Sequence, residues 1–281
     1  MEIQQVNQIP FVGDDLPLGN FIPHSRFARV INFINDQSRI VYLTSDRNLM
    51  AANAIYIPGA RLTDVQSLSV FPGKIMLDKI CFDRDEIEIY DSGFRYDGID
   101  GTAFQSRLFR IPGQFPELFP GKSLVVLLIP ERESFFKSGF DRQFMLNAMM
   151  SRDRILSGDV IGGIRAIRGT GYGLTPSGDD FIAGFLLGLH FNEAMYNVDL
   201  SALREHVYQA ASRSNPLINA FLLNAKNRNY FRPLKKILLL LCEELFAPVN
   251  DSLEELLSVG STSGADFFSG YMLPIKYKTG I

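Results

Sequence analysis

The sequence predicts an α+β protein, in which an N-terminal domain resembling a β-barrel or sandwich precedes a helical C-terminal domain. Short β-branched and aromatic runs separated by Pro-Gly turns are typical of the first domain, residues 1–135. From about residue 136 the apolar residues follow helical spacing instead, which gives a second domain, residues 136–281. This helical domain carries two copies of one short motif, and we expect the functional site there.

The composition is that of an ordinary globular protein. Of 281 residues, 46% are hydrophobic and 21% are charged, and the formal net charge is −3. This charge gives no reason to expect nucleic acid or an anionic membrane as a partner. No apolar run approaches the roughly 18–20 residues that span a bilayer, the N-terminus does not resemble a signal peptide, and Cys81 and Cys242 form no CxxC pair. We therefore expect a cytoplasmic protein.

The strands of the first domain are predicted from short apolar runs that end in turn signals. Pro-Gly pairs at 58–59, 72–73, 112–113 and 120–121 separate the runs. The fully apolar run at 124–129 is predicted to be a buried strand. The predicted strands are residues 28–34, 38–43, 54–57, 69–71, 74–77, 87–90 and 124–129.

The helices of the second domain are predicted from apolar stripes and from start signals. Asn215-Pro216 favours a helix start, with proline in the first turn. Residues 158–179 are predicted to form a loop, and the apolar segment that follows is predicted to be a central core helix. The predicted helices are residues 141–156, 180–191, 199–212, 216–223, 233–246 and 251–257, with a short last helix after the second motif.

The most informative stretch is Gly169-Thr-Gly-Tyr-Gly-Leu-Thr-Pro-Ser-Gly-Asp-Asp-Phe-Ile-Ala-Gly184. Its three closely spaced glycines permit positive φ angles and a close approach of the backbone to a ligand. Ser177 with Asp180 three positions later predicts a capping box at a helix start. A glycine-rich loop that leads into a helix N-terminus presents backbone N–H groups to an anion.

A second copy of the motif lies near the C-terminus. Ser263-Gly-Ala-Asp-Phe-Phe-Ser-Gly270 matches Ser177-Gly-Asp-Asp-Phe-Ile-Ala-Gly184 at Ser, Gly, Asp, Phe and Gly, in register. We predict that the two helix starts meet in space beside one shared cavity.

Three aspartates of these motifs, Asp179, Asp180 and Asp266, are the candidate catalytic residues. They would cap helices, bind Mg²⁺ (the candidate cofactor) as hard oxygen ligands, or orient a substrate and act as a base. An anion would be neutralised by an arginine near the loop, with Arg165 as a further candidate. The candidate substrate-binding residues are Arg168, Gly171, Gly173, Thr175, Ser177, Gly178, Arg213, Ser263 and Gly264.

Other residues of these segments have simpler interpretations. Gly184 and Gly188 lie one turn apart in the predicted core helix, which favours close packing of a neighbouring helix. His190, at the end of that helix, is expected to be structural. His24 stands before a predicted strand as an isolated catalytic candidate.

Gly173-Leu-Thr-Pro-Ser-Gly-Asp-Asp-Phe-Ile-Ala-Gly184 closely resembles the signature of a bacterial family, one branch of which is described as the AllH-type subunit of oxamate carbamoyltransferase. The resemblance extends to His24-Ser-Arg-Phe, Arg213-Ser-Asn and Gly260-Ser-Thr-Ser-Gly-Ala-Asp. It implies a role in purine or allantoin degradation, where oxalurate and phosphate exchange with oxamate and carbamoyl phosphate and partner subunits are required. The chain lacks the Ser-x-Arg-Thr phosphate loop of classical carbamoyltransferases, and Arg168-Gly-Thr is a distant stand-in.

The first functional hypothesis is therefore an anion-binding subunit of a small-molecule carbamoyltransferase, which works with partner subunits or as a homo-oligomer. Two alternatives remain open at this point. In one, the chain is a non-catalytic scaffold subunit whose motif only packs helices. In the other, it is a metal-dependent hydrolase that uses the three aspartates.

Overall fold

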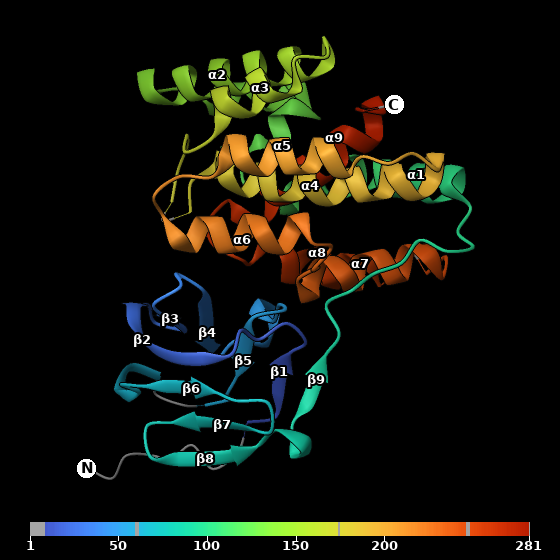
Figure 1. The fold of residues 1–281 in the computed structure, drawn as a ribbon. Helices are drawn as coiled ribbons and strands as arrows, with labels where there is room; N and C mark the ends of the chain where they lie inside the picture. Colours follow the sequence, from blue (N-terminus) through green and yellow to red (C-terminus); the bar gives the residue numbers. More distant parts are fainter. Residues whose placement is uncertain (1–8, 60–61, 174, 246–247, 281) are drawn as a thin grey trace. The chain divides into compact units, whose positions relative to one another are not determined.

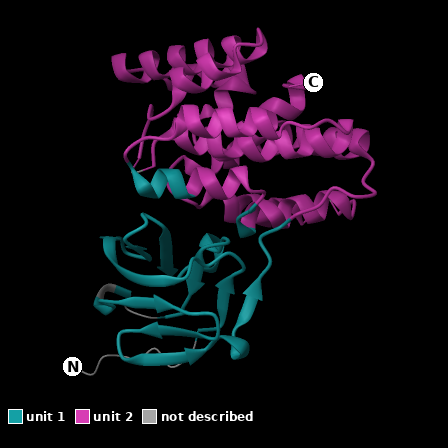
Figure 2. Ribbon diagram, viewed as in Figure 1, with its two compact units in different colours: residues 1–93, 215–220, 229–232 teal, residues 94–214, 221–228, 233–281 magenta. Residues whose placement is uncertain are grey.

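The computed structural model describes residues 9–59, 62–173, 175–245 and 248–280 (Figure 1). A curled sheet formed by the N-terminal part of the chain precedes a helical C-terminal part, so the predicted α+β class is confirmed. The chain divides into two compact units, coloured separately in Figure 2. Unit 1 comprises residues 1–93, 215–220 and 229–232, and unit 2 comprises residues 94–214, 221–228 and 233–281. The predicted domain boundary at residues 135 and 136 stays a prediction, while the division into units falls at residues 93 and 94.

Unit 1 contains a sheet that curls into a half-barrel (Figure 1). Its strands follow the order β8-β7-β6-β2-β3-β4-β5-β1-β9. Neighbours are antiparallel except for the pairs β4–β5 and β1–β9, which are parallel. The strands are β1 (Phe11–Gly13), β2 (Gly19–Arg26), β3 (Val30–Ile34), β4 (Ile40–Thr44), β5 (Ala54–Tyr56), β6 (Leu68–Val70), β7 (Lys74–Leu77), β8 (Ile80–Asp83) and β9 (Glu88–Tyr90).

The core of unit 1 follows from alternation along the central strands. In the β3–β4 pair, Ile31 lies opposite Leu43 and Phe33 lies opposite Val41, and all four side chains are fully buried. Because side chains alternate between the faces of a sheet, this register places the apolar residues of both strands on the inside of the curl. The predicted strands that correspond to β3, β4, β5, β6, β7 and β9 are confirmed.

Two predictions about the segment before residue 136 are wrong. The apolar run at 124–129 is no strand, because Leu124–Leu127 form the 3₁₀ helix η5. A continuous apolar run indicates that a segment is buried, and Leu124–Leu127 are indeed buried. Such a run has no period that would distinguish a strand from a helical turn. The Pro-Gly pair at 112–113 does not separate strands either, since it lies in the last turn of helix α1 (Gly101–Gln114).

Unit 2 is built mainly from helices, several of which extend beyond their predicted bounds. They are α1, α2 (Gly139–Leu156), α3 (Val160–Ile167), α4 (Ser177–Tyr196) and α5 (Ser201–Ala211), followed by α6 (Pro216–Lys226), α7 (Arg232–Cys242), α8 (Val249–Leu257) and α9 (Ser263–Tyr277). By residue number, α6 and α7 belong partly to unit 1. Helix α3 lies inside the segment predicted to be a loop, and α9 is longer than the short helix predicted.

Helix α4 is the centre of unit 2, as its apolar sequence predicts. Every residue from Ser177 to Glu193 is buried. Its main partner is α9, which is buried from Gly264 to Ile275. Within the described part of the chain, no helix combines the length and the apolarity that crossing a bilayer requires.

Candidate functional site

The two copies of the motif meet at the N-termini of α4 and α9, as predicted. The hydroxyl oxygens of Ser177 and Thr262, which begin or immediately precede the two helices, are 3.5 Å apart. The two helices pack along each other from this point. The cavity predicted beside the pair stays a prediction, and the structure shows a cavity near the other end of α4.

The shared glycines of the motif explain why the helices come so close. A Cβ atom on Gly184 would lie 1.9 Å from the carbonyl oxygen of Phe267, and one on Gly270 would lie 1.9 Å from that of Phe181. Gly184 and Gly270 hold the same position in the two copies, and so do Phe181 and Phe267. The contact is therefore reciprocal, as in a pair of helices related by a local two-fold axis. The packing role predicted for Gly184 is confirmed.

The local symmetry extends to the helix that precedes each copy. A Cβ on Gly178 would lie 1.9 Å from the carbonyl oxygen of Ile167, the last residue of α3. At the equivalent Gly264, a Cβ would lie 1.9 Å from the carbonyl oxygen of Leu256, in the last turn of α8. Each copy is thus a helix, a loop and a second helix that starts against the end of the first.

The predicted capping box is wrong. The N-cap residue of α4 is Pro176, and no side chain caps this helix. Ser177 is fully buried, and its hydroxyl accepts the backbone N–H of Tyr172 at 3.3 Å. Helix α9 likewise has no side-chain cap. Asp180 and Asp266 therefore have a role other than capping.

The two aspartates reach crosswise between the helices. The Ser263 hydroxyl of α9 interacts with the carboxyl of Asp180 in α4, and the Ser177 hydroxyl of α4 interacts with the carboxyl of Asp266 in α9. Both carboxyl groups are buried, with Asp180 3% and Asp266 0% exposed. Among the described residues, neither Oδ2 atom has a hydrogen-bond partner. Leaving a buried polar atom unpaired costs roughly 1–3 kcal/mol, so this arrangement needs a reason other than stability.

The surroundings of the two carboxyls indicate which one holds a proton. Burial raises the pKa of Asp180 well above its ordinary value, and the neighbouring charge of Asp266 raises it further. Burial also raises the pKa of Asp266, to about 7. Hydrogen bonds from the Leu124 N–H, Ser177 and Thr262 partly oppose this rise. Leu124 donates to Asp266 Oδ1 at 2.6 Å. Because more donors favour the charged form of Asp266, Asp180 is the carboxyl that keeps its proton to the higher pH.

Asp179 does not face this pair. One of its oxygens accepts the backbone N–H of Gly169 at 2.9 Å, and the other pairs with the guanidinium of Arg213. Burial raises the pKa of Asp179, while Gly169 and Arg213 oppose that rise. Gly169 has a φ of 69°, which favours glycine, and a Cβ there would lie 2.1 Å from Arg213 Nη1.

The other predicted binding residues have diverse surroundings. Arg168 donates to the carbonyl oxygen of Ala210 in α5. Arg165 and Gly173 are exposed, and Thr175 is half-buried. At Gly171, with a φ of 103°, a Cβ would lie 2.6 Å from Ser177 Cβ.

The backbone donors of two motif glycines are already used. The N–H of Gly178 donates to the carbonyl oxygen of Thr170 at 3.0 Å, and that of Gly264 donates to Val259 at 3.1 Å. A ligand at the motif would therefore be held by other groups of the loop and by arginine, and Gly178 and Gly264 would act by allowing close packing.

Further residues, which were not among the candidates predicted from the sequence, complete the site. Tyr172 lies in the loop, where its hydroxyl bonds to Asp141 of α2 and its ring packs against Phe140 and Phe144. Leu124, at the start of η5, supplies the N–H that Asp266 accepts. Of these residues, only Tyr172 could have been noticed in the sequence, as the one aromatic residue between the loop glycines.

The aspartates are not arranged as a set of metal ligands. Asp179 is engaged with Arg213, while Asp180 and Asp266 interact with serines of the opposite helix. Across the residues that the structure describes, no group of three or more His, Cys, Asp or Glu side chains is placed to hold a metal ion. The Mg²⁺ hypothesis therefore gains no support from this geometry.

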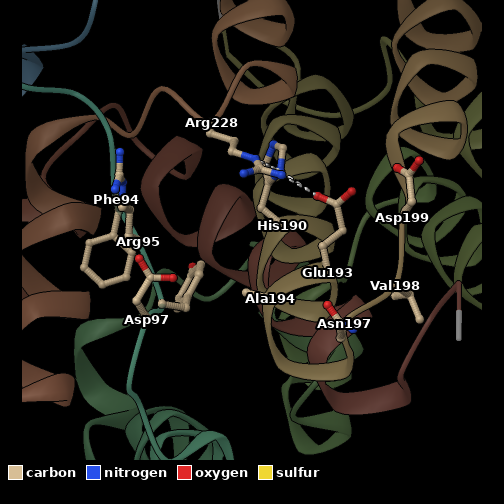
Figure 3. A pocket seen from close by; sticks show the side chains of 11 residues that line it. Phe94, Arg95, Asp97, His190, Glu193, Ala194, Asn197, Val198, Asp199 and Arg228 are labelled. Atoms are coloured by element: carbon tan, nitrogen blue, oxygen red, sulfur yellow. Dashed lines mark hydrogen bonds and ion pairs between the residues drawn. The ribbon is translucent and has the colours of Figure 1, made fainter.

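The cavity of about 700 Å³ that the structure shows in unit 2 lies near the C-terminal end of α4 (Figure 3). His190, predicted to be structural, lines it together with Glu193 and Arg228. His24, the isolated candidate, lies exposed in β2 of unit 1.

Part of the chain matches a known protein family. No curated protein and no solved structure matches the chain significantly. Residues 167–275 match the family described as oxamate carbamoyltransferase subunit AllH. This segment runs from the end of α3 into α9 and contains both copies of the motif. The resemblance predicted from the sequence is therefore confirmed by a match that covers residues 167–275.

Proposed function

We propose that the chain is a subunit of a small-molecule carbamoyltransferase of the oxamate, oxalurate and carbamoyl phosphate type, which works with partner subunits. The family match supports a carbamoyltransferase-associated subunit. The observation that carries the proposal is the pair of buried carboxyls, Asp180 and Asp266, each with an oxygen that lacks a partner among the described residues. A pair that is costly to bury and lies inside the matched segment favours a chemical role over a packing role.

The proposed reaction requires a proton to move in both directions. When an oxygen of hydrogen phosphate attacks the carbamoyl carbon of oxalurate, a C–O bond forms and the C–N bond to the oxamate nitrogen breaks. The phosphate loses its proton, and the oxamate nitrogen gains one. A carboxyl pair that holds a single proton serves both needs, because charged Asp266 accepts a proton and neutral Asp180 donates one.

The anion is proposed to bind at the loop of residues 169–173, beside Arg213 and Asp179. The Arg213 side chain is 36% exposed, and its pairing with Asp179 holds the guanidinium beside Gly169. A fixed guanidinium presents a fork of donors that matches carboxylate or phosphate oxygens. Arg168 adds charge near Asp179. In this role Asp179 positions the arginine.

The alternative of a non-catalytic scaffold is favoured by one observation, namely that the N–H groups of Gly178 and Gly264 are used within the fold. The metal-dependent hydrolase has less support, because the three aspartates do not converge. Carbamoyl transfer and metal-dependent hydrolysis both need the carboxyl charges, whereas a scaffold does not. Variants that remove those charges therefore distinguish a catalytic role from a scaffold.

The test measures carbamoyl phosphate formation from oxalurate and phosphate by the chain reconstituted with its partner subunits, and thermal shifts of the chain with each reactant. Asp180→Asn and Asp266→Asn are compared with Asp251→Asn, an exposed residue of α8. We expect the first two to lose at least 100-fold in rate without a lower Tm, and the control to keep its rate. Full activity of both asparagine variants would establish the scaffold instead. So would the absence of any thermal shift with oxalurate, phosphate, oxamate or carbamoyl phosphate.

A further inference from the structure

The cavity at the far end of α4 is a second place where polar groups converge. It is lined by residues of the last turns of α4, by the loop that follows, by the segment before α1 and by Arg228 after α6, all within unit 2 (Figure 3). From Asp180 to His190 is ten positions along α4, or about 15 Å at the helical rise of about 1.5 Å per residue. The cavity is thus separate from the paired carboxyls.

One wall of the cavity is a network that fixes the state of His190. Its Nε2 atom lies 3.0 Å from the carbonyl oxygen of Lys226 and 3.2 Å from that of Ala225, so this nitrogen carries the hydrogen. Nδ1 lies 3.0 Å from Arg228 Nε, which can only donate, and 3.2 Å from Glu193 Oε2, which can only accept. Burial lowers the pKa of His190, with Glu193 opposing and two nearby arginines adding to that shift, which favours the neutral ring with Nδ1 accepting from Arg228.

The same network orients Arg228. Its Nη2 atom donates to Glu193 Oε2 at 3.1 Å, and Glu193 also pairs with Arg204 and accepts the Leu200 N–H at 2.8 Å. Two arginines share one carboxylate, so this group carries a net positive charge. The Arg228 side chain nevertheless remains 57% exposed and lines the cavity. A non-glycine residue at a φ of 67°, as here, is unusual and requires such surrounding contacts.

The remaining charged residues give the cavity both signs. Arg95 adds a second guanidinium, and Asp97 and Asp199 add two carboxylates, all on exposed residues. A ligand with only anionic groups would meet these carboxylates, and one with only cationic groups would meet the arginines. A ligand that combines a carboxylate with N–H donors satisfies both sets. Phe94 completes the wall with an aromatic ring.

We infer that this cavity is a second binding site of the chain and takes a small carboxylate that also carries amide or ammonium N–H groups. The arginines at positions 95 and 228 receive the carboxylate, and Asp97 and Asp199 receive the N–H groups. Neutral His190 and buried Glu193 are positioning residues, because they hold Arg228 and leave the rest of its guanidinium to the ligand. The inference does not depend on carbamoyl transfer.

The test is isothermal titration of the full chain with four probes. Malonamate and glycine carry both a carboxylate and N–H donors, malonate carries only carboxylates, and acetamide carries only the amide. We expect malonamate or glycine to bind at least tenfold more tightly than malonate and acetamide. Equal binding of malonate, or no binding of malonamate and glycine, would overturn the inference.

Variants locate the binding. Arg228→Gln and Arg95→Gln are each expected to weaken it at least tenfold. Arg95 is exposed and lies outside the buried network, so its variant stays informative if Arg228→Gln impairs folding. Arg165→Gln, at an exposed arginine of α3, and Asp180→Asn are the matched controls and are expected to bind normally. Binding that is lost in Asp180→Asn but kept in Arg95→Gln would assign the ligand to the paired motifs and refute the second site.

Discussion

At the scale of single residues, the buried carboxyls of Asp180 and Asp266 matter most. The aspartates that sequence patterns assign to helix capping lie instead between two helices, each opposite a serine of the other copy. Their charge is disfavoured by burial, and two of their oxygens have no partner among the described residues. Natural proteins keep such costly groups mainly at functional sites.

This feature predicts an unusual dependence of stability on pH. A carboxyl whose pKa is raised by folding contributes stability that is fully present below its unfolded pKa of about 4 and is lost as pH rises through its folded pKa. For Asp266, with a folded pKa of about 7, that loss amounts to about 4 kcal/mol by neutral pH and above. The contribution of Asp180 changes with pH in the same direction, because burial raises its pKa and the charge of Asp266 raises it further.

We therefore predict that Asp180→Asn is as stable as the wild type at about pH 3.5, below the unfolded pKa, and more stable at pH 8 to 9, because asparagine resembles the neutral carboxyl and cannot ionise. Urea denaturation at both pH values measures the difference. Asp251→Asn, at an exposed residue, provides the baseline. A variant that is less stable than the wild type at pH 9 would show that ionised Asp180 is well solvated or paired.

At the scale of elements, the packing of α4 against α9 determines the site. Gly184 and Gly270 each admit a carbonyl oxygen of the opposite helix, so the two backbones approach closely at the level of the motif phenylalanines. An internal glycine in an isolated helix costs roughly 1 kcal/mol relative to alanine. The packing of two long buried helices offsets this cost.

The sign of a glycine substitution tests this packing. Gly184→Ala and Gly270→Ala would each place a Cβ 1.9 Å from a backbone oxygen, so we predict a loss of at least about 2 kcal/mol in the free energy of unfolding. Gly113→Ala, inside α1 with open space around its Cβ position, is the matched control and is expected to be neutral or stabilising. Stabilisation by alanine at both 184 and 270 would mean that the helices lie further apart than the structure shows.

Local sequence predicted the elements whose period was clear and missed those with ambiguous signals. Strand β3 alternates regularly and β4 is a nearly continuous apolar run, whereas β2 contains Pro23 next to polar residues, so it escaped notice. Helix α3 was missed because Gly162-Gly163 indicates a loop, although Gly163 in fact allows close contact with α2 at Ser151.

The candidate site divides in the same way. Repetition of the motif was visible along the chain, so the meeting of the two copies was predictable. The partners of Asp180 and Asp266 were not, because Leu124 and the serine of the opposite copy are distant in sequence and become neighbours only through tertiary packing.

At the scale of the whole molecule, the two units are not simple halves of the chain. Residues 215–220 and 229–232 belong to unit 1, although the segments around them belong to unit 2. Tyr230 of this returning segment is fully buried. Its N–H donates to Ser92 at 2.8 Å, and its carbonyl oxygen accepts the hydroxyl of Tyr90 at 2.9 Å. Unit 1 thus depends on residues far beyond position 93.

We predict that Tyr230→Ala lowers the free energy of unfolding by about 3–5 kcal/mol, the usual cost of truncating a buried aromatic ring. Tyr230→Phe keeps the ring and the backbone hydrogen bonds, so we expect it to cost less. Guanidinium denaturation, followed by circular dichroism, compares the two. An alanine variant as stable as the wild type would show that unit 1 holds together without the returning segment.

The reciprocal glycine contacts also restrict how the molecule can move. A slide of α9 past α4 by one turn, about 5.4 Å, would bring Asp266 or Pro274 to the place of Gly270, where only a residue without a Cβ fits the Phe181 carbonyl. The two helices can therefore pack in only one register along their axes, and neither can slide along the other. A crossing held in one register also keeps the spacing between the carboxyls of Asp180 and Asp266 constant.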